Sequence, residues 1–273
     1  MNYNHLSKPF WAIGFILIFL SLQLGVTSGV QIVEMVIQHT MQPELSPLDM
    51  IVAMAGFTII AIVLFGWLKW SPLPMTKSFV QSRPWGVLSW CLIASLGAII
   101  PSAYLQELMP EWSDSIQRYV EETATQMVRM MNTTGGYAVI CLLAPIAEEM
   151  VFRGAALRTL LEWQPRRRWL MIFLSTLLFA VAHMNPAQFL HPLLIGLLLG
   201  WMYERTGSIL PGIIYHWANN TVAYLMTRLY QDPDITVTQI FGSNERALMA
   251  VGCSLLIFLP ALYQLNLWMK RKG

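Results

Sequence analysis

Polar side chains that could carry out chemistry interrupt three apolar runs in the second half of this sequence. They are Glu148, Glu149, Arg153, His183, His216 and Asn220. An ionisable side chain costs about 2.5 to 3.5 kcal/mol at the centre of a membrane helix, so each one needs a compensating partner or a function. Together these residues predict a single polar cluster formed by three helices.

The two neighbouring carboxylates are expected to differ in their surroundings. Glu149 and Arg153 are four residues apart, so they share a helical face and can form an ion pair. Glu148 points about 100° away on the same helix, which leaves this carboxylate available. A buried Glu–Arg pair that only fixes helix packing, with Glu148 facing a water-filled crevice, is the structural alternative.

His216 and Asn220 are also four residues apart, so both project from one helical face toward the same space. A lone histidine in a membrane helix is often only a packing residue. Two histidines with carboxylates and an amide suit addition of water to a carbonyl group, where carboxylate and histidine handle the water proton and His and Asn stabilise the oxyanion. No Ser or Cys lies beside them in an elbow motif, so a covalent acyl-enzyme is not indicated.

Two other chemistries stay open at this point. Two histidines and a glutamate could bind zinc, although the HExxH pattern is absent and an arginine in the same turn would be unusual. A proton-coupled transporter also uses intramembrane Glu and His. Pro145 and Pro211 could supply the broken helices that transporters favour.

The composition indicates a membrane protein. The chain has 273 residues, of which 56% are hydrophobic and 12% are charged, whereas a soluble domain carries about 25% charged residues. A net charge of +2 argues against a nucleic-acid partner. Cys91, Cys141 and Cys253 each lie in an apolar run without metal-ligand spacing, so we interpret them as packing residues.

The elements that must position the polar cluster are apolar runs at 10–26, 48–68, 85–104, 137–157, 169–184, 189–203, 209–226 and 247–268. At about 20 apolar residues per crossing, they predict an all-α polytopic membrane bundle of about eight transmembrane helices enclosing a polar catalytic cavity. The fifth and sixth runs are short for a full crossing. We expect one integral membrane domain over 1–273, with the catalytic core at about 137–228.

Charge placement predicts the orientation of these helices. Most Lys and Arg residues lie near residues 8, 69–83, 153–168, 205 and 270–272, and most Asp and Glu residues lie in the alternate loops. Cytoplasmic loops collect Lys and Arg, so both termini are expected to be cytoplasmic. The alternative is that the first run is a cleaved signal peptide, with small residues at 27–29.

Two further features have structural interpretations. The polar connection at 106–136 alternates acidic and apolar residues, which is compatible with an amphipathic outer helix, and its function is not legible. Gly196 and Gly200 form a GxxxG pattern that lets another helix approach closely. We assign this pattern to packing within the chain rather than to dimerisation.

Three short motifs in order resemble those of a known family. The stretch from Glu148 to Arg153 resembles an EExxxR motif, Phe179 to His183 an FxxxH motif, and His216 to Asn220 an HxxxN motif. These are motifs of the CAAX prenyl endopeptidase and bacteriocin-processing (Abi/CPBP) membrane protease family. The stretch 206–216 also resembles the family's approach to its third motif, so the resemblance covers about 144–220.

The resemblance implies an intramembrane glutamate protease that works without a metal or a cofactor in the best-understood members. By motif position, Glu148 would be the general base and His183 its partner on the water. The oxyanion donors would be His216 and Asn220. The supporting residues would be Glu149, Arg153 and Phe179.

The resemblance also implies the class of substrate, a membrane-associated protein or peptide met at the lipid bilayer. Some family members remove the last three residues after a prenylated cysteine, whereas many bacterial members have other substrates. A non-proteolytic membrane protein, such as a proton-coupled transporter or a bacteriocin immunity protein, is the alternative function.

Overall fold

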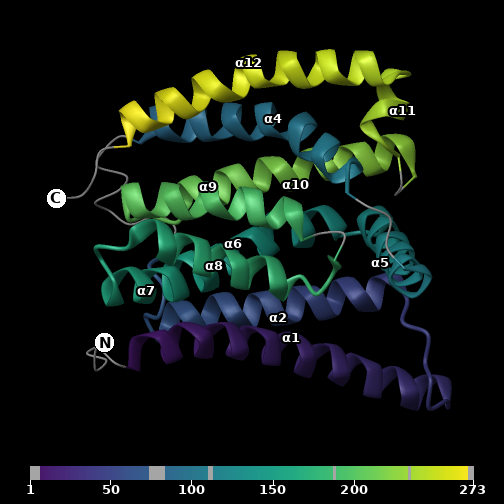
Figure 1. Ribbon diagram of the computed structural model, residues 1–273. Coiled ribbons are helices and arrows are strands. Elements are labelled where there is room, and N and C mark those ends of the chain that lie inside the picture. Colours follow the sequence, from purple (N-terminus) through teal and green to yellow (C-terminus); the bar gives the residue numbers. More distant parts are fainter. Residues whose placement is uncertain (1–6, 74–83, 110–112, 187–188, 233–234, 270–273) are drawn as a thin grey trace.

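The computed structural model describes residues 7–73, 84–109, 113–186, 189–232 and 235–269, which contain helices and no strand (Figure 1). The helices are α1 Lys8–Gln38, α2 Pro47–Trp67, α4 Trp85–Glu107, α5 Asp114–Asn132, η2 Ala138–Leu143, α6 Ala144–Glu148, η3 Glu149–Leu157, α7 Arg158–Trp163, α8 Arg168–Ala182, α9 Leu190–Thr206, α10 Leu210–Tyr230, α11 Val237–Phe241 and α12 Asn244–Trp268. The predicted all-α class is confirmed. The basic residues expected at 77, 83 and 270–272 lie outside the described residues.

Local signals in the sequence set several helix ends. At the start of α2, the Ser46 hydroxyl accepts a hydrogen bond from the Asp49 amide, and the Asp49 carboxylate accepts one from the Ser46 amide. This reciprocal pair satisfies two amides that the first helical turn would leave unbonded. At the end of α9, Gly207 adopts a φ of 63°, which a glycine reaches without the strain that a Cβ would cause.

Within the described ranges, four helices are long and apolar enough to cross a membrane. They are α1, α2, α4 and α12. Their outward faces keep large apolar side chains exposed, among them Leu17, Val63, Leu96 and Leu256. An exposed apolar surface of this kind marks contact with a membrane or a partner. On these helices it fits a multi-pass membrane protein surrounded by lipid.

The expected count of eight spanning helices is not confirmed. Helix α8 has 15 residues and α9 has 17, so both are shorter than the four long helices. Helix α10 is long enough, but it carries His216, Asn219 and Asn220. The fourth apolar run becomes a helical stretch over 138–163 that changes between π-helical and α-helical turns. The runs that hold the polar cluster are therefore those that depart from a simple membrane span.

Both described chain ends lie at one end of the bundle, which we call the terminal end (Figure 1). Lys8 at the start of α1 forms an ion pair with Glu162 at 3.3 Å. Arg205 at the end of α9 donates a hydrogen bond to the Met269 carbonyl at 2.9 Å. The terminal end therefore brings together the start of α1, the ends of α7 and α9, and the last described residue of the chain. This arrangement is the one that an even number of crossings between the two chain ends would give.

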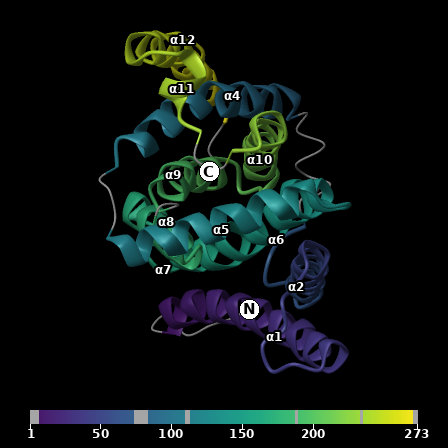
Figure 2. The ribbon, with the colours of Figure 1, turned by 90° about the vertical axis from the view of Figure 1, so that its right-hand side faces the viewer.

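Helix α5 lies across the opposite end of the bundle, which we call the α5 end (Figures 1 and 2). Its Met131 is buried, while Glu121 and Glu122 are exposed, so the helix is amphipathic as expected for 106–136. The Tyr119 hydroxyl donates a hydrogen bond to the Met184 carbonyl at 3.1 Å. Helix α5 thus covers this end of the bundle and is anchored just beyond the end of α8.

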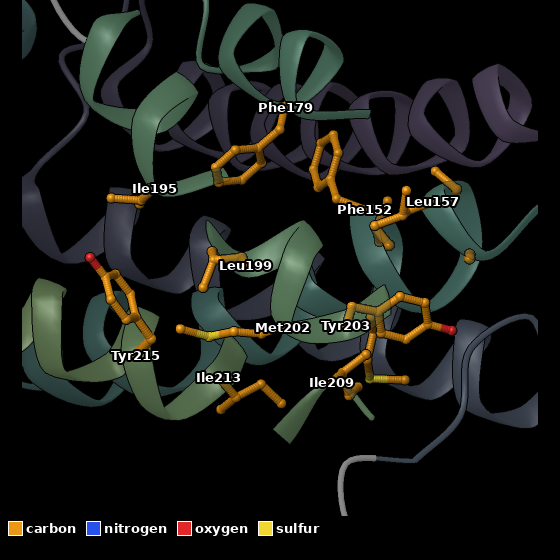
Figure 3. Close-up of a cluster of buried hydrophobic side chains, with 14 of the residues drawn as sticks. Phe152, Leu157, Phe179, Ile195, Leu199, Met202, Tyr203, Ile209, Ile213 and Tyr215 are labelled. Carbon is orange, nitrogen blue, oxygen red and sulfur yellow. The ribbon is translucent and has the colours of Figure 1, made fainter. Parts of the chain in front are cut away.

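The core lies where η3 meets α8, α9 and α10, and all nine residues of η3 are buried. Phe152 and Phe179 face each other in Figure 3, with ring centroids 5.0 Å apart in an edge-to-face arrangement. A Cβ at Gly196 would lie 2.7 Å from the Thr176 side chain. One at Gly200 would lie 2.7 Å from the Ile172 side chain. The GxxxG pattern therefore serves close packing of α9 against α8, as expected.

Candidate active site

A cavity of about 630 Å³ has a lining that reaches from Phe152 of η3 to Met127 and Met131 of α5. Its polar lining includes Glu148, His183, His191, His216, Asn219 and Asn220, together with Gln23, Ser102 and Gln106. The rest of the wall is mostly apolar and includes Phe19, Phe57, Met127, Met131 and Ile195. Residues from three separate motifs are thus brought to one chamber, as the cluster hypothesis expected.

Glu149 and Arg153 form the buried ion pair that their spacing predicts. The Arg153 Nη1 atom lies 2.8 Å from Glu149 Oε1, and both side chains are almost fully buried. The guanidinium lies 4.3 Å from the centroid of the Phe179 ring, a cation–π contact. Its Nη2 atom also donates to the Gly196 carbonyl at 3.5 Å. The pair is held behind the cavity wall rather than in the lining.

A glycine gives this ion pair the space it needs. A Cβ at Gly212 would lie 2.6 Å from Glu149 Oε2, closer than real Cβ contacts come. Helix α10 can therefore approach the buried carboxylate only because position 212 has no side chain. The glycine brings His216, one turn further along α10, next to both glutamates.

His216 lies between the two carboxylates. Its Nε2 atom is 3.7 Å from Glu148 Oε2, and its Nδ1 atom is 3.5 Å from Glu149 Oε1. Both distances are longer than an N–H···O hydrogen bond. Glu148 Oε2 and Glu149 Oε2 both have no hydrogen-bond partner among the described residues, but only Glu149 has its other oxygen paired with Arg153, and only Glu148 lines the cavity. The structure brings His216, and not His183, into contact with Glu148.

His183 follows the last residue of α8 and lines the same cavity. Its Nδ1 atom lies 2.8 Å from the Phe179 carbonyl. A carbonyl only accepts hydrogen bonds, so Nδ1 carries the proton and Nε2 of the neutral ring is left as an acceptor. The Phe179 ring meets the imidazole edge to face at 4.8 Å. Phe179 therefore contacts both His183 and Arg153, which gives the first residue of the FxxxH motif a physical role.

Asn220 has one of its amide hydrogens engaged within the protein. Its Nδ2 atom donates to the Ile140 carbonyl in η2 at 3.1 Å. Because an amide group has two N–H donors, one further donor is available at this side chain. Asn220 lines the cavity, so the remaining donor is suitably placed for a group bound there.

Sequence reasoning missed several polar residues of the cavity, and two of them, His191 and Asn219, contact each other. They lie 3.1 Å apart, between His191 Nε2 and Asn219 Nδ2. A histidine at the start of the sixth apolar run was the available signal. It stands 25 positions before His216 in the printed sequence, without a helical spacing to any motif residue, so no pattern linked it to the cluster.

No group of three or more His, Cys, Asp or Glu side chains is arranged to hold a metal ion in the part of the chain that the structure describes. The prolines that could have broken helices do not do so. Pro145 lies within the continuous helical stretch 138–163, and Pro211 lies in the first turn of α10. The feature that favoured a transporter is therefore not seen at either proline.

Comparison with known proteins identifies one family. Residues 131–222 match the family model described as type II CAAX prenyl endopeptidase Rce1-like. The match covers about a third of the chain and contains all three motifs. The resemblance predicted from those motifs is thus confirmed over this region, which supports an endopeptidase. No curated protein and no solved structure matches the chain.

Proposed function

We propose that this chain is an intramembrane endopeptidase of the CAAX prenyl protease type. The observation that carries the proposal is that Glu148, His183, His216 and Asn220, which come from three distant parts of the chain, line one cavity. The family match of residues 131–222 supports the same reaction class. The catalytic core would be about 137–228 within one membrane domain of 273 residues.

In this proposal, Glu148 and His183 activate the attacking water. Glu148 accepts a water proton as the general base, and Nε2 of His183 accepts a hydrogen bond from the same water. The hydroxide oxygen attacks the carbonyl carbon and the carbonyl oxygen takes the electron pair. When the C–N bond breaks, the proton held by Glu148 passes to the leaving amine. Each residue thus returns to its starting state.

His216 and the second amide hydrogen of Asn220 would stabilise the oxyanion. Donors that are already oriented toward the developing charge lower the barrier without reorganising during the reaction. The Glu149–Arg153 ion pair supports this arrangement because it neutralises the second carboxylate. Glu148 is then the carboxylate left to act on water. Glu149, Arg153 and Phe179 are supporting residues in this proposal.

We further propose that the substrate is a membrane-associated protein or peptide with an apolar portion. The apolar wall beside the polar lining includes Phe19, Phe57, Met127 and Ile195. Methionine adapts its shape to irregular apolar groups. A prenylated cysteine carries such a group, so a prenylated peptide is the first substrate to try. No observation favours the transporter or the immunity protein.

Cleavage of a quenched-fluorescent farnesylated peptide by the purified protein in detergent tests the proposal. Mass spectrometry of membrane peptides extends the search to other substrates. Replacing Glu148 by Gln keeps the shape but removes the base, so we expect turnover to fall about 100-fold to 10,000-fold. The matched change Glu122→Gln on the exposed face of α5 should leave turnover unchanged. Near-wild-type cleavage by Glu148→Gln would make Glu149 the candidate base.

A metal-free reaction is also part of the proposal, since the first motif pairs glutamate with arginine rather than with a zinc-binding HExxH helix. Prolonged chelation should leave peptide cleavage intact, and metal analysis should find no stoichiometric zinc. Loss of cleavage that only zinc restores would instead assign Glu148, His183 and His216 as metal ligands.

A further inference from the structure

Three side chains form a chain of hydrogen bonds along the cavity wall. Asn219 Nδ2 lies 3.1 Å from His191 Nε2 and 3.4 Å from Asn220 Oδ1. Asn220 Nδ2 in turn donates to the Ile140 carbonyl at 3.1 Å. The chain therefore runs from α9 through α10 to η2, and Asn220 is its last side chain.

The chemistry of these groups fixes the direction of each bond. An amide nitrogen donates and cannot accept, so His191 Nε2 must be the acceptor and the proton of the neutral ring lies on Nδ1. The two amide hydrogens of Asn219 then serve His191 and Asn220. The Asn220 oxygen is held as an acceptor, and its nitrogen faces Ile140 and the cavity.

The backbone supplies the last acceptor. The Ala144 amide donates to the Val139 carbonyl, five residues earlier, as in a π-helical turn. In the same register the donor for the Ile140 carbonyl would be residue 145, which is a proline without an N–H. The Ile140 carbonyl is therefore open to the Asn220 side chain.

We propose that His191 and Asn219 are positioning residues that hold the Asn220 amide with its nitrogen toward the reacting carbonyl group. The oxygen and nitrogen ends of an amide have nearly the same shape, so only hydrogen bonds decide which end faces the cavity. A turned amide would present oxygen to the developing oxyanion and repel it. This proposal rests on the proposed endopeptidase function.

Variants at His191 separate positioning from packing. His191→Leu fills the space of the imidazole with an apolar side chain and removes the acceptor. We therefore expect kcat with the farnesylated peptide to fall about 10-fold to 100-fold, as for other supporting residues. The KM should change little, because the oxyanion develops in the transition state. His191→Gln places an oxygen near the former Nε2 atom and should restore most of kcat. His39→Leu, at the exposed end of α1, is the control: the same change of residue outside the cavity should leave kcat unchanged.

A double-variant cycle tests the route through Asn220. Asn220→Ala alone should lower kcat about 100-fold to 1,000-fold, as for loss of one oxyanion donor. In that background His191→Leu should cause no further loss, because the residue it positions has gone. An undiminished effect of His191→Leu, or a loss of kcat that Gln fails to restore, would overturn the proposal.

A measurement independent of activity completes the test. In wild-type protein labelled with ¹⁵N-histidine, the His191 signal, assigned with His191→Gln, should show a protonated Nδ1 and an unprotonated Nε2. A proton on Nε2 would overturn the positioning network even if the protein is an active protease. The protein could instead show the expected tautomer and yet cleave no membrane peptide. That result would refute the proposed function, and the positioning proposal with it.

Discussion

At the scale of single residues, two adjacent glutamates have been given opposite surroundings. Glu149 is fully buried against Arg153, while Glu148 lies in the cavity lining and forms no ion pair with an arginine or lysine. A one-residue step around a helix is enough to separate a neutralised carboxylate from an available one. The difference predicts that the same substitution will have different consequences at the two positions.

We expect Glu149→Gln to lower both stability and activity. The amide cannot neutralise Arg153, and leaving one charge of a buried pair without its partner costs about 3 to 5 kcal/mol. Thermal unfolding in detergent should therefore show a clearly lower Tm than wild type. Glu148→Gln should keep its Tm, because that carboxylate has no buried cationic partner of its own.

The double variant Glu149→Leu with Arg153→Met is the control for this prediction. Removing both charges with apolar replacements of similar size is often neutral for stability, so part of the lost Tm should return. Equal Tm values for Glu148→Gln and Glu149→Gln would contradict the proposed division between the two carboxylates.

At the scale of elements, the helical stretch 138–163 does more than present the first motif. Its proline prevents one backbone hydrogen bond without ending the helix, and the freed Ile140 carbonyl orients Asn220 from α10. Proline in a helix interior normally costs about 3 kcal/mol, so its presence there calls for a reason. The hydrogen bond to Asn220 offers one.

We predict that Pro145→Ala lowers kcat without lowering stability. An alanine at this position supplies an N–H that can bond the Ile140 carbonyl, so Asn220 has to share this acceptor and is held less firmly. Activity with the farnesylated peptide and Tm should be measured together. Pro260→Ala, in the interior of α12 and away from the cavity, is the matched control and should leave kcat unchanged. A normal kcat in Pro145→Ala would show that Asn220 does not need this carbonyl.

The sequence predicted the helices better than it predicted the contacts between them. Apolar runs identified the long apolar helices α1, α2, α4 and α12, because an apolar run of this size has few alternatives. The pairing of Glu149 with Arg153 was predictable because it is local. The approach of His216 to Glu148 depends on Gly212 letting α10 close on η3, which is a tertiary property.

The two missed residues that contact each other, His191 and Asn219, share one physical reason. His191 and Asn219 interact across two helices, and nothing in their spacing along the chain reports that contact. The number of membrane crossings stays a prediction, since the polar residues that make the site lower the apolar character of the helices carrying them. Local pairs and long apolar runs could be predicted from the sequence, whereas contacts between helices could not.

At the scale of the whole molecule, one group of basic residues and the cavity lie toward different ends. Basic residues Lys8, Arg158, Arg168 and Arg205 lie at the terminal end, where Lys8 and Arg168 form ion pairs with Glu162 and Glu204. The cavity lining comes from the middle of the bundle and the α5 end, and includes Met127 of α5. The side of the membrane that faces α5 is therefore the side nearer the proposed catalytic residues.

We predict that cysteine labelling will place the two ends of the bundle on opposite sides of the membrane. Arg167→Cys should react with an impermeant thiol reagent from the cytoplasm, because cytoplasmic segments collect basic residues. Glu122→Cys and Glu245→Cys should react from the other side. The positions Glu111, Asp234 and Lys272 would report the same sides, but they lie outside the described residues.

Sided vesicles connect this topology to catalysis. The background should carry Cys253→Ser, since Cys253 is exposed whereas Cys91 and Cys141 are buried, and this background alone should not label. A water-soluble quenched peptide should be cleaved only when added to the side that labels Glu122→Cys, because the cavity extends toward α5. Cleavage from the side that labels Arg167→Cys would contradict this access route. If labelling places both termini in the cytoplasm, as the basic residues predict, this outcome makes the substrate one that is presented at the extracytoplasmic face.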